Sequence, residues 1–212
     1  LVLIFFNIEI SDDVSKIDHA YFSSENAKQW ASELTKTLNR DEKFTLVTYQ
    51  QLVGVCLYVF IRTELAPCIT EVAVDFVKTG MGGATGNKGT VGIRLQYHTT
   101  TIAFVASHFA AGQKGISERN EDYKEAINKI MFPKVIFDNG KHIFCDYWLA
   151  IVQCEYLLAF HLFLQGSVLL SHDYVFWCGD FNYRIDMARD DVKAAVVEKD
   201  WDTLLSADQL KV

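Results

Sequence analysis

The segment that most constrains this chain is "HDYVFWCGDFNYRID" (172–186), where polar side chains directly follow an apolar run. Residues 173–178 are rich in aromatic and β-branched types, which predicts a buried strand. After Gly179 the chain presents Asp180 and Asn182. A carboxylate at the end of a strand sits on rigid backbone, where it can orient or deprotonate a water, and Asn182 faces the same side if the chain stays extended. The alternative is an ordinary strand-to-turn junction, in which Gly, Asp and Asn are common.

A second apolar run also ends in a titratable group. "TTIAFVASH" (100–108) follows "GTVGIRLQY" (89–97) after a short polar turn, and the two are expected to form a hairpin. A lone His at a strand end is more often structural than functional. Two buried strands that both end in polar side chains can nevertheless converge on one pocket. We therefore expect His108 and Asp180 to lie within side-chain reach of each other.

The segment "KTGMGGATGNKGT" (78–90) is rich in glycine. Glycines allow positive φ and a close approach of the backbone to a ligand, and Asn87 and Lys88 offer an amide and a cation to a phosphate. The alternative is a flexible hairpin loop. The segment is not a P-loop, because Gly89 follows Lys88 and no strand-to-helix transition follows.

Apolar spacing along the rest of the chain predicts an α/β architecture of mixed sheets covered by helices. Apolar residues recur at every third or fourth position in 24–39, which predicts an amphipathic helix. Further strands are expected at 51–61 and 71–77, and residues 189–206 are expected to be helical.

Residues 117–131 combine many charges with apolar spacing, which predicts a surface helix. Arg119, Asn120 and Asp122 on this helix are candidates to face a site. A solvated helix face is the favoured interpretation of these three residues.

Residues 134–170 do not fit the pattern, because the run 156–170 is almost wholly apolar. It is shorter than the roughly 20 residues that a membrane span needs. A buried or interfacial helix is the favoured interpretation. An aberrant inserted segment, such as a translated intron, and a true membrane span are the alternatives.

Composition restricts the ligand and the compartment. The formal net charge of −7 gives no global basic field for nucleic acid, so an anion has to be held by a local basic patch. The five cysteines are odd in number and irregularly spaced, which favours a reducing compartment. The apolar run at 1–10 lacks a basic region and a small-residue cleavage site, so we interpret it as a core strand rather than a signal peptide.

Together these stretches resemble the inositol polyphosphate 5-phosphatase family, in matching order and spacing from about residue 24 to the end. The resemblance implies a DNase-I-like (endonuclease/exonuclease/phosphatase) α/β fold, a two-sheet sandwich with flanking helices that is truncated at its C-terminal side. Residues 1–212 would then be a partial catalytic domain with an atypical insertion at about 134–170. The matching stretches are "QLVGVCLYVFIR" (51–62), "VKTGMGGATGNKGTVGIR" (77–94), "SHFAAGQ" (107–113), "ERNEDYKE" (118–125), "HDYVFWCGDFNYRID" (172–186) and "DQL" (208–210).

The resemblance also implies the reaction, which is Mg²⁺-dependent removal of the 5-phosphate from phosphoinositide lipids and soluble inositol phosphates during membrane traffic. By motif position, Asp180 would activate the attacking water and Asn182 would orient the water or the phosphate. His108 would stabilise the phosphate under attack. A metal-bound phosphoryl transfer of this kind depends on positioning and charge neutralisation more than on covalent chemistry.

Substrate contacts follow from the same resemblance. Asn87 and Lys88 would hold the 1-phosphate, while Tyr183 and Arg184 would support the pocket wall. Expected partners are phosphoinositides, inositol polyphosphates and the anionic surface of membranes, reached from the cytoplasm, with no nucleic acid. Two alternatives remain: a Mg²⁺-dependent nuclease of the same fold, and a non-catalytic lipid-binding product.

Three departures from the family pattern bear on these expectations. The Mg²⁺-ligating Glu of the family has Glu9 as its only candidate, in flanks that do not match. The segment 134–170 replaces a short connection. The family's C-terminal segment with a catalytic His has no counterpart before Val212, so little or no turnover and poor stability are expected of this chain alone.

Overall fold

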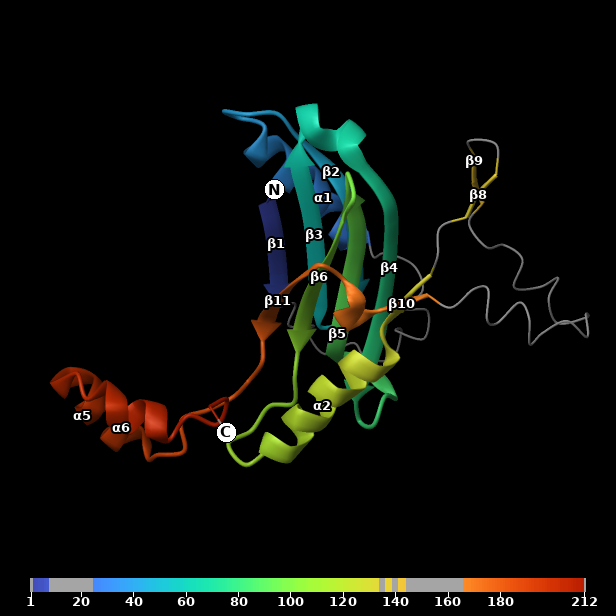
Figure 1. Cartoon of the computed structure of the whole chain (residues 1–212). Helices are drawn as coiled ribbons and strands as arrows, with labels where there is room; N and C mark the ends of the chain where they lie inside the picture. Colours follow the sequence, from blue (N-terminus) through green and yellow to red (C-terminus); the bar gives the residue numbers. More distant parts are fainter. Residues whose placement is uncertain (1, 8–24, 134–135, 139–140, 144–165, 212) are drawn as a thin grey trace, which may run out of the picture.

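The computed structural model describes residues 2–7, 25–133, 136–138, 141–143 and 166–211, and its centre is a pair of β-sheets (Figure 1). The first sheet is antiparallel and has the order β1 (Val2–Asn7), β3 (Val55–Arg62), β2 (Phe44–Leu52). The second sheet has the order β11 (Tyr174–Asp180), β6 (Thr100–His108), β5 (Thr85–Tyr97), β4 (Ile69–Gly80). In the second sheet β11 and β6 run parallel, whereas β6, β5 and β4 are antiparallel.

The main hydrophobic core lies between the two sheets. Leu57 and Val59 of β3 pack in one cluster with Ile93 of β5 and with Phe104 and Ala106 of β6. All five side chains are buried, as expected for facing layers that exclude water. The core contacts between the sheets reach Ala106, close to the end of β6 at His108.

Helix α1 (Glu25–Leu38) covers the outer face of the first sheet. Its small residues Ala27 and Ala31 pack against Tyr58 and Phe60, which point outward from β3. The Tyr58 hydroxyl donates a 2.9 Å hydrogen bond to the carbonyl of Ala27, which satisfies its buried polar group.

Helix α2 (Ile116–Lys129) covers the outer face of the second sheet. Ala126 and Ile130 pack with Ala103 and Val105, which lie on the face of β6 opposite the main core. The predicted two-sheet sandwich with flanking helices is thus confirmed. The other described elements are η2 (Thr63–Cys68), β7 (Met131–Phe132), β8 (Ile136–Asp138), β9 (Lys141–Ile143), β10 (Ser167–Val168), η3 (Leu169–Ser171), α5 (Arg189–Glu198) and α6 (Trp201–Ser206).

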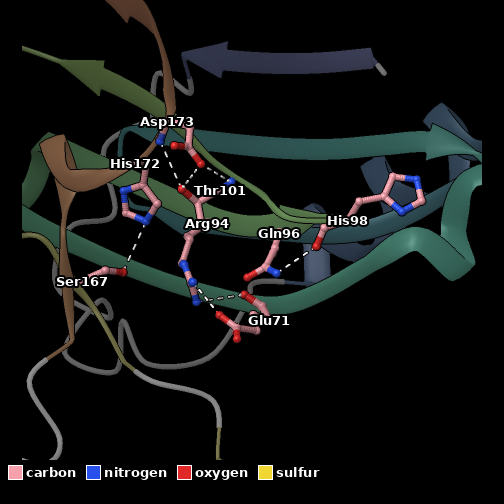
Figure 2. Close-up of polar contacts among 8 residues, drawn as sticks. All are labelled: Glu71, Arg94, Gln96, His98, Thr101, Ser167, His172 and Asp173. Atoms are coloured by element: carbon pink, nitrogen blue, oxygen red, sulfur yellow. Dashed lines mark hydrogen bonds and ion pairs between the residues drawn. The ribbon is translucent and has the colours of Figure 1, made fainter.

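Polar contacts join the start of β11 to β6 (Figure 2). Asp173 Oδ2 accepts hydrogen bonds from the backbone N–H and the hydroxyl of Thr101, both at 2.8 Å, and the Asp173 N–H donates to the Thr101 hydroxyl at 3.0 Å. The next residue, Tyr174, pairs with Ile102, and the register continues without a shift to the end of both strands. The contacts of Asp173 and Thr101 are thus in line with the register that pairs Asp180 with His108 at the far ends of the strands.

Two sequence predictions about the extent of the elements need correction. The apolar run 51–61 is divided by a turn, because Gly54 leaves the strand direction and donates to the Gly86 carbonyl at 3.1 Å. The run therefore belongs to two strands, and β2 was not predicted. The helical region 189–206 is two helices, with Lys199 at φ 58° between them and the Asp200 side chain capping α6 through Thr203 N–H at 3.1 Å.

The apolar segment 134–170 lies largely outside the described residues. Within the apolar run 156–170, the described end forms β10 and the first residues of η3, so these positions do not belong to the helix that we favoured. Within the described part of the chain, no helix is both long and apolar enough to cross a bilayer. The predicted N-terminal strand is confirmed as β1.

Candidate phosphate site

His108 and Asp180 lie side by side at the ends of β6 and β11. The parallel register pairs them directly, so both side chains leave the same face of the sheet. Asp180 Oδ2 lies 3.9 Å from His108 Nε2. The imidazole is largely buried, with 14% of its side chain exposed, whereas the carboxylate is 45% exposed and open to solvent. The predicted convergence of two strand ends is therefore confirmed.

Lys88 brings a cation to the same place. It precedes Gly89, which pairs with His108 across β5 and β6, and its ammonium contacts His108 Nε2. Burial lowers the pKa of Lys88, the carboxylates of Asp180 and Asp122 act in the opposite direction, and Arg184 lowers the pKa further. The site thus joins an amine, an imidazole and a carboxylate from three strands.

The glycine-rich segment is mostly strand rather than loop. Strand β4 runs to Gly80 and β5 begins at Thr85, which leaves only a short turn between them. Asn87 and Lys88 therefore sit within β5, where neighbouring side chains point to opposite faces. Lys88 reaches His108, while Asn87 Oδ1 accepts a 2.7 Å hydrogen bond from the Thr85 hydroxyl. The flexible-loop alternative is wrong for these positions, and a phosphate contact by Asn87 stays a prediction.

The chain turns after Asp180, so the condition under which Asn182 would face the same side, an extended chain, is not met. Asn182 has φ 56°, a left-handed conformation that Asn tolerates better than most residues. Its N–H donates to Asp180 Oδ1 at 3.0 Å, and its side-chain Nδ2 donates to the Phe109 carbonyl at 2.9 Å. Asn182 therefore holds the Asp180 carboxylate and ties it to the residue that follows His108.

Tyr183 and Arg184 brace this turn. The Tyr183 hydroxyl donates to Asn120 Oδ1 at 2.6 Å, and burial raises the pKa of that phenol. Arg184 donates to the side-chain oxygen of Asn182 at 2.6 Å and to its carbonyl at 3.0 Å. Both residues therefore brace the turn that holds Asp180, while their role in the wall of a substrate pocket stays a prediction. Direct contact with a substrate stays a prediction for both.

Two charged residues of α2 were wrongly assigned to a solvated face. Arg119 is fully buried and Asp122 is 7% exposed, because this side of α2 packs on the segment that follows β6. Asp122 Oδ2 accepts a 2.7 Å hydrogen bond from Ala110 N–H, and burial raises the pKa of its carboxyl. The sequence did carry a signal: Arg119 and Asp122 continue the helical stripe of Ala126 and Ile130 at spacings of three and four.

The donor chemistry of the site suits a hard cation in part. Asp180 supplies an exposed carboxylate, and oxygen donors are the ligands that Mg²⁺ and Ca²⁺ prefer. Among the described residues, no three His, Cys, Asp or Glu side chains cluster closely enough to hold a metal alone. Glu9, the other predicted ligand, lies outside the described residues. A metal here would therefore share its coordination with phosphate oxygens and water.

The sequence matches the family described as "Endonuclease/Exonuclease/phosphatase family 2" over residues 7–212. The chain belongs to this family. Synaptojanin-1 of Rattus norvegicus is 50% identical over 188 residues, which are 89% of this chain and 10% of that protein. Type II inositol 1,4,5-trisphosphate 5-phosphatase of Mus musculus is 32% identical over 201 residues, 94% of this chain and 18% of that protein. The chain thus spans less than a fifth of either relative.

A solved structure shares the fold. It is the crystal structure of the inositol polyphosphate 5-phosphatase domain of SPsynaptojanin in complex with inositol (1,4)-bisphosphate and calcium ion, and it superposes with a TM-score of 0.69 at 25% identity. The match covers 98% of this chain and 51% of that one. The predicted fold and the resemblance to inositol polyphosphate 5-phosphatases are therefore confirmed.

Proposed function

We propose that this chain forms the phosphate site of a Mg²⁺-dependent phosphatase that removes the 5-phosphate from phosphoinositides and soluble inositol phosphates. The observation that carries the proposal is the cluster of Lys88, His108 and Asp180 at converging strand ends. Among the relatives is an inositol 1,4,5-trisphosphate 5-phosphatase, and the solved neighbour holds inositol (1,4)-bisphosphate. Removing the 5-phosphate of inositol 1,4,5-trisphosphate would yield that bisphosphate, so the two names agree in chemistry.

Each residue of the cluster has a part in transfer of the phosphoryl group to water. Lys88 and His108 offer N–H donors to the phosphate oxygens, whose negative charge has to be neutralised. Asp180 accepts a proton from the attacking water, in an orientation held by the N–H of Asn182, while the bond from phosphorus to the 5-oxygen of inositol breaks and that oxygen takes up a proton from solvent. The positions are fixed by strands rather than by loops, which keeps the reacting groups aligned.

The proposed reaction also requires Mg²⁺. Mg²⁺ bound beside Asp180 would supply charge neutralisation and an acidified water, and Glu9 would provide a second carboxylate. Because Mg²⁺ commonly takes one or two carboxylates together with substrate phosphates, a cluster with few acidic residues suits it.

The proposed lipid substrate implies where the protein would work. The proposed substrate class includes phosphatidylinositol 4,5-bisphosphate, so the protein would work in the cytoplasm at the surface of anionic membranes. The net charge of −7 would oppose binding to such a surface, so contact would depend on local cations such as Lys88. The same net charge disfavours nucleic acid as a substrate.

Three incubations of the chain with Mg²⁺ test the proposal: inositol 1,4,5-trisphosphate, phosphatidylinositol 4,5-bisphosphate in vesicles, and supercoiled plasmid DNA. Release of the 5-phosphate, with inositol (1,4)-bisphosphate as the soluble product, supports a 5-phosphatase, and it would also show that the expectation of little or no turnover by this chain alone is wrong. Nicking of DNA without phosphate release supports a nuclease of the same fold. Binding of inositol phosphates without release supports a non-catalytic module. The absence of both binding and release would overturn the proposal.

A further inference from the structure

Arg119 and Gln209 form a buried polar contact behind the phosphate site. Arg119 is fully buried and Gln209 is 8% exposed. The Arg119 guanidinium donates from Nη1 to the carbonyls of Ala110 and Gly112, at 3.2 and 2.8 Å, and from Nη2 to Gln209 Oε1 at 2.5 Å. A buried guanidinium is costly unless such acceptors are provided, so these positions are strongly specified.

Gln209 connects two segments of the chain. Its Oε1 also accepts from the Arg184 N–H at 3.0 Å, and its Nε2 donates to the Gln113 carbonyl at 2.9 Å. The Gln113 side chain in turn donates to the Ile185 carbonyl at 2.8 Å. The segment that follows β6 and the segment that follows β11 are thereby joined through side chains.

These two segments start at the residues of the phosphate site. Residues 109–113 follow His108 directly, and residues 181–185 follow Asp180 directly. Neither segment belongs to a strand, so no sheet ladder aligns them. Close to the site, residues 109 and 180 are joined by a hydrogen bond from Phe109 N–H to the Asp180 carbonyl at 3.0 Å. The contacts of Arg119 and Gln209 extend that alignment beyond the ends of the strands.

We propose that Arg119 and Gln209 are positioning residues of the phosphate site, which hold the segments after His108 and Asp180 in register. The inference rests on the proposed function for its consequence in catalysis. The alignment of the two segments does not depend on that function, because Arg119 and Gln209 act through other groups and neither contacts the reacting atoms. Arg119 and Asp122 leave α2 on the same side, so the helix serves both as a cover of the sheet and as a support of the site.

Four variants of the chain test this role. Gln209→Met keeps the length of the side chain and removes both hydrogen-bonding groups. Gln209→Glu keeps the acceptor for Arg119 and for the Arg184 N–H, so it should rescue much of the effect. Gln113→Ala removes an exposed link and carries little risk to folding. Ile130→Val is the matched control, because it loosens the buried core under α2 without touching this network.

The first readout needs no ligand and is the NMR spectrum of the His108 ring and the Asn182 side-chain amide. Gln209→Met and Gln113→Ala should shift these signals, Gln209→Glu should shift them less, and Ile130→Val should leave them in place. Wild-type positions in Gln209→Met and Gln113→Ala would overturn the proposal. If either variant fails to fold, the other decides.

The second readout is phosphate release from inositol 1,4,5-trisphosphate. Misalignment should lower kcat roughly 10- to 100-fold with KM within about threefold, while the control stays close to wild type. Shifted NMR signals in a chain that releases no phosphate would support the positioning role and count against the proposed function. Unchanged kcat together with unchanged NMR signals would remove the positioning role alone.

Discussion

Asp180 lies directly opposite His108 in the parallel register of β11 and β6, with 3.9 Å between Asp180 Oδ2 and His108 Nε2. At the other end of the same strands, Asp173 and Thr101 exchange hydrogen bonds that are in line with this register. We expect these contacts to contribute to the alignment that brings Asp180 and His108 together.

Asp173→Asn should weaken the fold in a pH-dependent way. Hydrogen bonds from the backbone N–H and the hydroxyl of Thr101 lower the pKa of Asp173 below its ordinary 3.8. A lowered carboxyl pKa stabilises the fold above the ordinary value, and this contribution is lost as the pH falls through the lowered pKa. In urea unfolding, the wild type should exceed Asp173→Asn in stability near neutral pH, and the difference should shrink on acidification.

The matched control for Asp173 is Asp190→Asn, which removes an exposed carboxylate that pairs with Lys193 within α5. It should change stability very little. Equal acid sensitivity in wild type and Asp173→Asn would refute a role for this carboxylate in the alignment.

Gly179→Ala should disrupt the site from within β11. Gly179 has φ 134°, and a Cβ there would lie 2.1 Å from the Ser107 carbonyl oxygen of the neighbouring strand. The strained backbone and the steric overlap together should lower the free energy of unfolding by about 3 kcal/mol or more. Gly82→Ala is the control, since Gly82 also has positive φ (66°) but open space around it, so it should cost about 1 kcal/mol. Equal costs for the two variants, measured by chemical unfolding, would contradict the close approach at Gly179.

Lys88→Met should weaken phosphate binding. Loss of a charge-assisted hydrogen bond costs about 1.5–3 kcal/mol, or roughly 10- to 100-fold in Kd. Calorimetric titration with inositol 1,4,5-trisphosphate measures this, with Lys124→Met on the exposed side of α2 as a control for net charge. An equal loss of affinity in both variants would show that only overall charge matters.

The lowered pKa of Lys88 has its own signature. Because burial lowers this pKa from 10.5, the ammonium loses its proton at a lower pH than an exposed lysine, and affinity for phosphate should fall as the pH rises through that lowered value. Between the lowered value and 10.5 the unfolded chain binds more protons at this position, so its contribution to stability should rise with pH there. Lys88→Met should lack both effects.

The strand ends were predictable from sequence because long apolar runs mark buried strands, and the residue at which each run stops is visible. His108 and Asp180 were found in this way, and their meeting follows from the alignment of two neighbouring parallel strands. Lys88 was found because a cation next to glycines suggests a phosphate contact. The place of Lys88 within β5 was not predicted, because glycines usually indicate a loop.

The supports of the site were not predictable by the same reasoning. Counting charges assigned Arg119 and Asp122 to solvent. Helical spacing places both on the buried stripe of α2, but it does not reveal the segment that supplies their hydrogen-bond partners. For Asn182 the sequence left open an extended chain or a turn, because the alternation of side chains does not reveal a backbone that turns left-handed and bonds Asp180 and Phe109. Hydrogen bonds between these side chains and groups distant in the sequence decide where Arg119, Asp122 and Asn182 lie.

Release of the 5-phosphate from inositol 1,4,5-trisphosphate, compared between wild type and Asp180→Asn under single-turnover conditions with Mg²⁺, tests the site most directly. The substitution keeps the shape of the side chain and an acceptor for the Asn182 N–H, so the fold should be unchanged. We predict a fall in rate of roughly 100- to 10,000-fold with an unaltered unfolding midpoint. A rate within about threefold of wild type would contradict the role of Asp180 as the residue that activates water.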